Sequence, residues 1–110
     1  AYDRRSEIVS AAQNRVDHLI ITLEHTDDEP VEHVCQNMLD SVTNPDLDAR
    51  IILDRTEAVE STVAIDRKNP NRLHIILIIG KGNERWFKDH GKHIPFEGDN
   101  HIVERIFGLA

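Results

Sequence analysis

The chain has 110 residues, a length that suits one domain with an independent but modest hydrophobic core. Its 20 acidic and 13 basic residues give a formal charge of −7, which argues against a general nucleic-acid binder because such proteins present a basic face. The single cysteine, Cys35, excludes an internal disulfide, and no apolar run is long enough for a membrane span. We therefore expect a domain of the reducing cytoplasm that binds neither nucleic acid nor membrane.

The part of the chain before residue 68 alternates between two patterns of apolar residues. Stretches with apolar residues three or four positions apart predict amphipathic helices, and short β-branched runs predict strands. Ser6 and Thr56 are expected helix N-caps, and Pro30 suits a first helical position. In chain order we predict a helix over residues 4–17, a strand over 18–22, an acidic loop over 23–29, a helix over 30–43, a turn over 44–48, a strand over 50–54 and a helix over 56–67.

The most distinctive stretch is residues 73–84, with the sequence LHIILIIGKGNE. Five consecutive branched aliphatic residues, 75–79, predict a strand that is buried on both faces. Gly80 and Gly82 then allow a sharp turn or a close approach of the backbone to a ligand. Glu84 is expected at the carboxyl end of this strand, where open α/β sheets bind their ligands.

The polar stretch after residue 84 contains aromatic residues and a glycine, and it predicts a small hairpin. A final helix follows, with Asp99 or Asn100 as the expected N-cap. The residues of this helix that we expect to face inward are Ile102, Val103, Ile106 and Phe107.

The alternation of helices and strands predicts an α/β fold with a mostly parallel sheet and right-handed crossovers. Helices on both faces of such a sheet give a three-layer, Rossmann-like domain. Three strands make a thin parallel sheet, and the chain opens on a helix. We therefore expect a domain that is truncated at its first strand, in a chain that is an excised fragment.

The loop after the isoleucine-rich run, GKGNE, leaves two interpretations open. It is not a P-loop, since Asn83 stands where a serine or threonine would hold magnesium, and it lacks the third glycine of a dinucleotide fingerprint. In the functional interpretation, Glu84 presents its carboxylate to a cationic ligand group such as an amine. In the alternative, the segment is a tight turn with solvated Lys81 and Glu84.

Two further charged stretches are candidate binding elements. The acidic loop 24–29 follows the carboxyl end of another predicted strand, so a parallel sheet would place it on the same edge as Glu84 and create a sink for a cation or basic substrate. Composition alone favours a solvated acidic loop. Arg4 and Arg5 at a helix start could meet phosphate, although the residues alone slightly favour a solvated helix end.

Metal and nucleophile sites are not supported by the residue spacing. His90 and His93 are three residues apart but have a glycine between them, and no histidine spacing matches a zinc pattern. Cys35 lies on the apolar face of a predicted helix, with nothing that fixes a histidine beside it. We expect no metal ligands and no catalytic residue in this chain.

Four pieces of the chain together resemble the C-terminal domain of the Mur ligases, most closely those that add the third residue of the peptidoglycan stem peptide. The resemblance is colinear over nearly all 110 residues, and GKG-x-E is its most specific motif. The four pieces are RRSEIVSAAQNRVDHLIIT, PVEHVCQNML, IILDRTEAVESTV, and IIGKGNE followed by PFEGDNHIVERIF.

The resemblance implies an ATP-dependent amide ligase that uses Mg2+, of which residues 1–110 are the C-terminal, amino-acid-binding domain. In that family, ATP phosphorylates the carboxylate of a UDP-N-acetylmuramoyl peptide, and the amine of the incoming amino acid attacks the acyl phosphate. By position, Gly80 and Glu84 would hold the amino acid, and Arg5 would lie at the phosphate-facing edge. The resemblance also implies that the fragment is inactive alone and binds neither ATP nor Mg2+ by itself.

One departure from the family pattern bears on the choice of amino acid. Members that add diaminopimelate have DNPR where this chain has Glu24, His25, Thr26 and Asp27, so an acid replaces the arginine that would meet a second carboxylate. Charge complementarity then favours an amino acid with a cationic tail, L-lysine, with Glu24, His25 and Asp27 among its ligands.

Other interpretations stay open at this point. Within the superfamily the alternative is a folylpolyglutamate synthetase-type domain, and outside it a stand-alone α/β binding or interaction module. A third is a metal-binding regulator that uses the histidines. A strand left unpaired by truncation would also favour a homodimer through the edge of the sheet.

Overall fold

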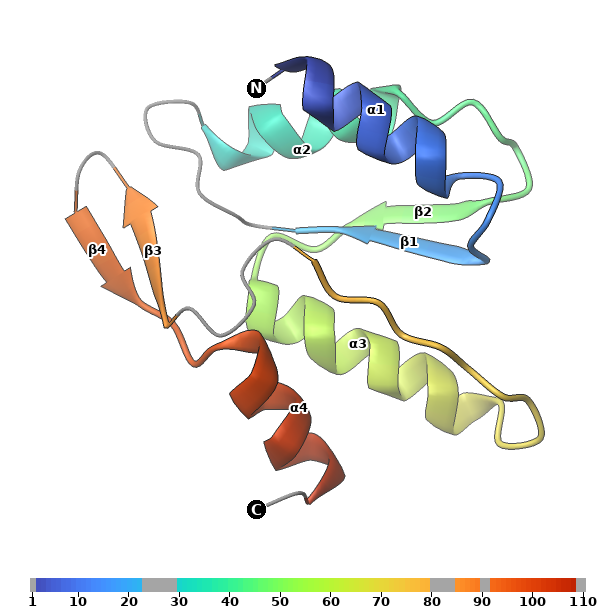
Figure 1. Cartoon of the computed structure of the whole chain (residues 1–110), viewed down its shortest axis with the longest axis vertical. Coiled ribbons are helices and arrows are strands. Elements are labelled where there is room, and N and C mark those ends of the chain that lie inside the picture. The colour runs from blue at the N-terminus through green and yellow to red at the C-terminus, as the bar shows by residue number, and fades with distance from the viewer. Residues whose placement is uncertain (1, 23–29, 80–84, 90–91, 109–110) are drawn as a thin grey trace.

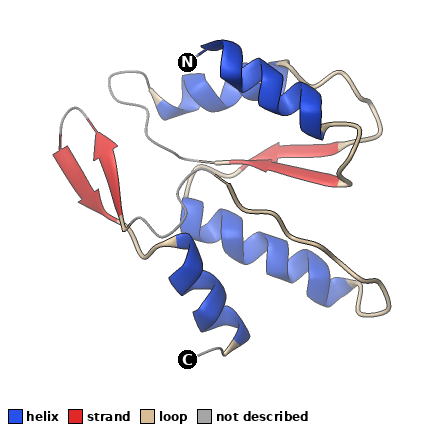
Figure 2. Cartoon of the chain, in the orientation of Figure 1, coloured by secondary structure: helices blue, strands red, loops and turns tan. Residues whose placement is uncertain are grey.

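The computed structural model describes residues 2–22, 30–79, 85–89 and 92–108. Within these ranges the chain forms four helices, a parallel pair of strands and an antiparallel pair (Figures 1 and 2). None of the described helices is both long and apolar enough to cross a membrane. The elements are α1 (Tyr2–Ala12), β1 (His18–Ile21), α2 (Val31–Asp40), β2 (Asp48–Ile51), α3 (Arg55–Lys68), β3 (Trp86–Asp89), β4 (Lys92–Pro95) and α4 (Asp99–Phe107).

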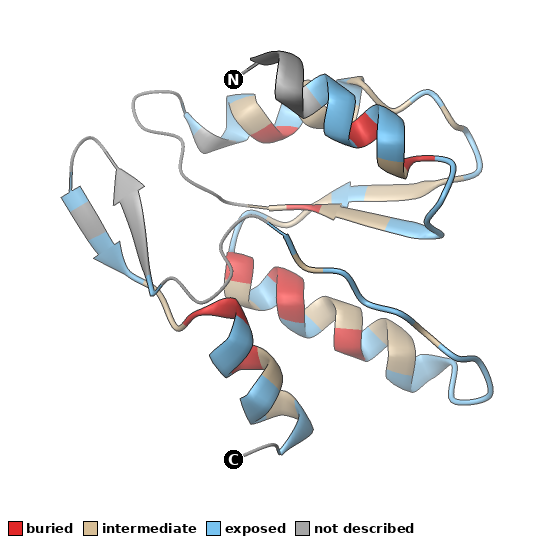
Figure 3. Ribbon diagram, viewed as in Figure 1, coloured by how far each residue is buried: buried red, intermediate tan, exposed pale blue. Residues whose placement is uncertain are grey.

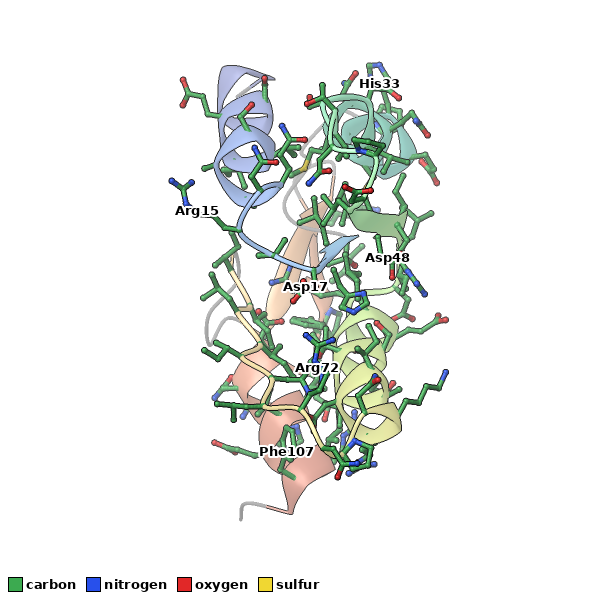
Figure 4. The ribbon with its side chains drawn as sticks, turned by 90° about the vertical axis from the view of Figure 1, so that its right-hand side faces the viewer. Arg15, Asp17, His33, Asp48, Arg72 and Phe107 are labelled. Carbon is green, nitrogen blue, oxygen red and sulfur yellow. The ribbon has the colours of Figure 1, made fainter. Side chains whose placement is uncertain are left out.

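The parallel pair confirms the prediction that the first two strands run in the same direction. β1 pairs with β2 from His18 opposite Asp48 to Ile21 opposite Ile51. In Figure 1, α1 and α2 lie on one side of this pair and α3 on the other, and the view in Figure 4, turned by 90°, shows the same order. The described residues thus form a small α/β unit, in which the sheet between the helices has two strands.

The buried apolar residues, which are among the buried positions coloured in Figure 3, fall into two groups of elements. One group belongs to α1, β1 and α2, and the other to α3 and α4, which pack against each other. The first group consists of Val9, Ile21 and Cys35, and the second of Ala58, Val59, Val63 and Ile102.

The helix starts differ from the predicted positions, and in α3 two nearby residues, Asp54 and Thr56, are chemically able to cap. α3 is capped by Asp54, whose carboxylate accepts from the backbone N–H of Glu57 at 3.1 Å, so the expected cap Thr56 lies inside the helix. Ser6 also lies inside a helix, since α1 begins at Tyr2. Pro30 occupies the N-cap position of α2, one residue before its expected place.

The start and the inner face of α4 also depart from expectation. Its N-cap is Gly98, with a φ of 94° that favours glycine, so Asp99 is the first helical residue and neither Asp99 nor Asn100 is the cap. Ile102 is buried as predicted. Phe107, expected to face inward, is 46% exposed at the last turn of the helix.

Residues 73–79 are the main correction to the sequence prediction. They have no strand assignment and no ladder partner among the described residues, and much of the segment is exposed rather than buried on both faces. An isoleucine-rich run becomes a buried strand only where neighbouring strands and helices cover it. The exposed fractions alternate along the segment: Leu73 is 93% exposed, Ile75 92%, Leu77 80% and Ile79 56%, whereas His74 and Ile78 are partly buried.

The hairpin predicted after residue 84 is confirmed. β3 and β4 pair antiparallel, from Trp86 opposite Pro95 to Asp89 opposite Lys92. The backbone N–H of Phe96 donates to the carbonyl of Arg85 at 2.8 Å, which closes the open end of the hairpin next to α4.

Candidate functional site

Most of the residues singled out from the sequence lie outside the described residues. These are Gly80 and Glu84 after the isoleucine-rich segment, and Glu24, His25 and Asp27 in the acidic stretch. Arg5 belongs to α1, but its side chain is also outside the description. The geometry of the site is therefore built from the described residues that lead into these two stretches.

The acidic stretch is entered from the carboxyl end of β1. There the backbone N–H of Ile52 donates to the carbonyl of Ile21 at 3.0 Å, which continues the parallel pairing one residue beyond β2. One residue further, the hydroxyl of Thr22 donates to the carbonyl of Leu53 at 3.4 Å. Thr22, the last described residue before residues 23–29, is therefore held beside the turn between β2 and α3.

The GKGNE stretch is entered from a point held by Arg55, at the first position of α3. The guanidinium of Arg55 donates from Nε to Oδ1 of Asp99 at 2.8 Å and from Nη2 to Oδ2 at 2.7 Å. The same Nη2 donates to the backbone carbonyl of Ile79 at 2.9 Å. Ile79, the last described residue before residues 80–84, is therefore tied to the start of α3 and, through Asp99, to the start of α4.

Thr22 and Ile79 are both hydrogen-bonded to residues of one short segment between β2 and α3. Leu53 accepts a hydrogen bond from Thr22, and Arg55 donates one to Ile79. Leu53 and Arg55 are two positions apart, so their Cα atoms lie within about 7 Å. This arrangement is what the carboxyl edge of a parallel α/β unit provides for a ligand. Thr22 and Ile79, the residues that precede the two stretches carrying Asp27 and Glu84, are thus both hydrogen-bonded to the segment between β2 and α3.

The opposite, amino ends of the two strands carry a separate charge cluster. His18 Nδ1 and Arg50 Nη2 lie 2.8 and 2.6 Å from Oδ2 of Asp48. The hydrogen bond from Arg50, followed by the one with His18, holds the pKa of the Asp48 carboxyl below its ordinary value. Because His18 and Asp48 begin their strands, this cluster lies at the end of β1 and β2 away from Thr22 and Leu53.

Cys35 has the environment of a structural thiol rather than a nucleophile. It is 1% exposed on α2, and burial, followed by the negative charge of Glu32, raises the pKa of its thiol. A raised pKa keeps the thiol protonated near neutral pH, where only the thiolate is reactive. Across the described ranges, no three His, Cys, Asp or Glu side chains gather as metal ligands would.

A groove of about 410 Å³ lies between α3 and α4. Its described lining comes from these two helices, whose packing leaves space toward their ends. The lining residues are Glu60, Val63, Ala64, Arg67, Lys68 and Ile106.

Sequence reasoning missed the pairing of Arg55 with Asp99. The two residues are 44 positions apart, and no local pattern connects them. A signal was present, because each lies in one of the quoted motifs: Arg55 in ILDRTEAV and Asp99 in PFEGDNHIV. Two oppositely charged residues, each at the buried start of a helix, are candidates for a pair, since a buried charge needs a partner.

The chain matches no model of a known protein family. Among curated proteins it is 52% identical over 109 residues to the UDP-N-acetylmuramyl-tripeptide synthetase of Bifidobacterium longum (strain NCC 2705), covering 99% of this chain and 21% of that protein. It is 26% identical over 108 residues to the UDP-N-acetylmuramoyl-L-alanyl-D-glutamate--2,6-diaminopimelate ligase of Aquifex aeolicus (strain VF5), covering 96% of this chain and 21% of that protein. It is 24% identical over 103 residues to the UDP-N-acetylmuramyl-tripeptide synthetase of Ligilactobacillus salivarius (strain UCC118), covering 94% of this chain and 19% of that protein.

The chain therefore spans about a fifth of the length of the curated relatives that it matches. These matches show homology to ligases of peptidoglycan synthesis along nearly the whole chain.

Proposed function

We propose that this chain is the amino-acid-binding, C-terminal part of a longer UDP-N-acetylmuramyl-tripeptide synthetase. The observation that carries the proposal is the 52% identity to such a protein over 109 residues. The structure supports it by tying Thr22 and Ile79, the residues that precede the two candidate stretches, to one turn. Enzymatic activity is proposed for the longer protein, in the cytoplasm, and not for these 110 residues alone.

The proposed reaction forms an amide between a UDP-N-acetylmuramoyl-dipeptide and an amino acid. The terminal carboxylate of the peptide takes the γ-phosphoryl group of ATP and becomes an acyl phosphate, and ADP leaves. The amine of the incoming amino acid attacks the acyl carbon, loses a proton, and displaces phosphate. In the longer enzyme, Mg2+ would neutralise charge on the phosphates. The described residues of this chain include no group of three potential metal ligands.

The proposed role of this chain is to hold the incoming amino acid so that its amine faces the acyl phosphate. Glu84, with the backbone of Gly80, is assigned to the charged groups at the α-carbon. Glu24, His25 and Asp27 are assigned to the far end of the side chain. The net charge of −7 and the acids in both stretches suit a cationic tail, so L-lysine is the favoured amino acid. Arg5 is assigned to the phosphate-facing edge.

The test is amide formation by the full-length enzyme, with product mass and ADP release measured for lysine and for diaminopimelate. The proposal expects an amide product with lysine preferred, and a Glu84→Gln variant whose KM for the amino acid rises. Glu104→Gln, an exposed carboxylate on α4, is the matched control and should behave as the parent enzyme does. No amide product with either amino acid would overturn the function, and a preference for diaminopimelate would overturn the lysine assignment.

We also propose that residues 73–79 are a strand of a wider, three-layer Rossmann-like sheet in the longer enzyme, whose first strand lies outside this chain. The support is the alternation of exposed apolar side chains, such as Ile75 and Leu77, along a segment that has no ladder partner among the described residues. Strands carry a side-chain period of two, so one face of this segment is ready for burial. In the isolated chain, the same edge is proposed to pair with a second copy.

A further inference from the structure

Three of the hydrogen bonds of Arg55 connect three parts of the chain. Two go to the two carboxylate oxygens of Asp99 at the start of α4, and the third goes from Nη2 to the carbonyl of Ile79. Arg55 is 4% exposed and Asp99 5% exposed, so the ion pair is shielded from water. The sequence places Ile79 24 residues after Arg55, immediately before Gly80.

The third hydrogen bond is not needed to neutralise the pair. The carboxylate of Asp99 already balances the charge of the guanidinium, and a lysine at position 55 could do the same. What an arginine adds is a planar fork whose N–H groups point in fixed directions, so that one Nη2 reaches both Asp99 and Ile79. The carboxylate thus fixes the plane of the guanidinium, and the guanidinium fixes the direction of the Ile79 carbonyl.

We infer that Arg55 is a positioning residue for amino-acid binding, oriented by Asp99 and acting through the carbonyl of Ile79. This inference rests on the proposed function, in which Gly80 and Glu84 bind the incoming amino acid. A backbone held at Ile79 starts the binding segment from one defined position. Loss of the hydrogen bond from Arg55 to the carbonyl of Ile79 lowers the affinity for the amino acid and leaves the ATP and UDP-N-acetylmuramoyl-dipeptide sites unaffected.

The test uses the full-length enzyme with Arg55→Lys, and measures KM separately for the three substrates. We expect the KM for the amino acid to rise roughly tenfold, the effect of losing one charge-assisted hydrogen bond, with the other two KM values unchanged. Arg105→Met is the matched control: Arg105 also donates two hydrogen bonds to one carboxylate, that of Glu97, but at an exposed position without contact to Ile79 among its hydrogen bonds. Its KM values should match those of the parent enzyme.

A second variant separates positioning from stability. The double variant Arg55→Met/Asp99→Leu replaces the buried pair by apolar side chains, which restores folding where a single substitution impairs it. Positioning predicts that its KM for the amino acid stays high although its melting temperature recovers. A purely structural pair predicts that KM recovers together with stability, and that result would overturn the inference.

The failure of this inference is distinguishable from failure of the proposed function. An enzyme that forms no amide at all overturns the function. In that case the carbonyl of Ile79 in the 110-residue chain is still measurable by NMR. Its 13C resonance should move upfield in Arg55→Lys, as a carbonyl does when it loses a donor, and stay in place in Arg105→Met. An unchanged resonance in Arg55→Lys overturns the positioning role itself.

Discussion

Arg55 and Asp99 are joined by two parallel hydrogen bonds of 2.8 and 2.7 Å, although 44 residues separate them. Both residues begin a helix, and both are almost completely buried. The pair thereby joins the start of α3 to the start of α4 without help from a strand. Removal of one partner leaves the other charge buried without compensation, which costs far more than the pair itself contributes.

The first prediction follows from this difference between removing one partner and removing both. Arg55→Met and Asp99→Leu should each lower the free energy of unfolding by about 3 to 5 kcal/mol, while the double variant should recover most of that loss. Urea unfolding of the 110-residue chain, followed by circular dichroism, measures all three. Losses that simply add in the double variant would show that the two side chains act independently, contrary to the geometry.

The second prediction concerns the exposed apolar face of residues 73–79. Leu77 is 80% exposed, so Leu77→Lys should leave the free energy of unfolding nearly unchanged. It should also reduce self-association, because a lysine on an unpaired edge opposes strand pairing. Sedimentation velocity at several concentrations measures the effect.

Ile94→Lys is the control for this second prediction, since Ile94 is an aliphatic residue of β4 that is 44% exposed and lies outside the segment. It should leave any association unchanged. Equal association of the parent chain and Leu77→Lys would contradict an edge formed by residues 73–79.

The third prediction is a dependence of stability on pH that arises from Asp48. Arg50 and His18 hold the pKa of its carboxyl below the ordinary value in the folded state. A depressed pKa contributes stability above the ordinary carboxyl pKa of about 4, and that contribution is lost as the pH falls through the lower, folded value. Asp48→Asn should therefore reduce stability at neutral pH and flatten its decline under acid.

The measurement for this third prediction is the urea midpoint as a function of pH. Glu97→Gln provides a parallel case, because Arg105, followed by His101, lowers the pKa of Glu97 in the same direction. A curve for Asp48→Asn that keeps the full acid decline of the parent chain would mean that Asp48 does not contribute to it.

The fourth prediction concerns Gln13, a polar side chain that is 7% exposed at the end of α1. Its Oε1 accepts from the backbone N–H of Thr43 at 2.8 Å and from that of Asn44 at 3.1 Å. Gln13→Ala leaves these donors without their partner, so we expect a loss of about 1 to 3 kcal/mol in the free energy of unfolding. Gln36→Ala, which removes only an exposed bond to Asp40, should cost much less, and equal losses would contradict the argument.

Local sequence predicted the structure correctly at several elements. The apolar run predicted as a strand forms β1 (His18–Ile21), and Asn44 begins the predicted turn, with its side chain accepting from the N–H of Asp46 at 3.0 Å. Cys35 lies on the buried face of α2, as its spacing predicts. The turn depends on a residue two positions away, and β1 has in β2 the partner strand that its pattern requires.

Local sequence failed where the outcome depends on distant parts of the chain. Residues 73–79 carry the strongest strand signal, yet a strand requires a partner, and the described residues supply none. Asp54 and Thr56 can both cap a helix, and only the path of the backbone after β2 decides between them. The contact of Arg55 with Asp99 depends on the packing of α3 against α4, which no spacing reports.

The last prediction tests the proposed choice of amino acid at Asp27, which the family resemblance places where diaminopimelate-adding members have the arginine of DNPR. A carboxylate repels the second carboxylate of diaminopimelate and attracts the ammonium of lysine, so charge reversal should invert the preference. In the full-length enzyme, Asp27→Arg should lower kcat/KM for lysine and raise it for diaminopimelate, by roughly tenfold in their ratio for each 1.4 kcal/mol of changed interaction.

Asp46→Arg is the matched control for this last prediction, because it makes the same charge change in the turn after α2, where Asp46 is exposed. A general effect of charge would shift the ratio of the two kcat/KM values equally in both variants. A local effect would appear only in Asp27→Arg, because salt screens exposed charges that are more than about 8 Å apart at physiological ionic strength. An unchanged ratio in Asp27→Arg would remove the acidic stretch from the amino-acid site and leave Glu84 as its remaining carboxylate.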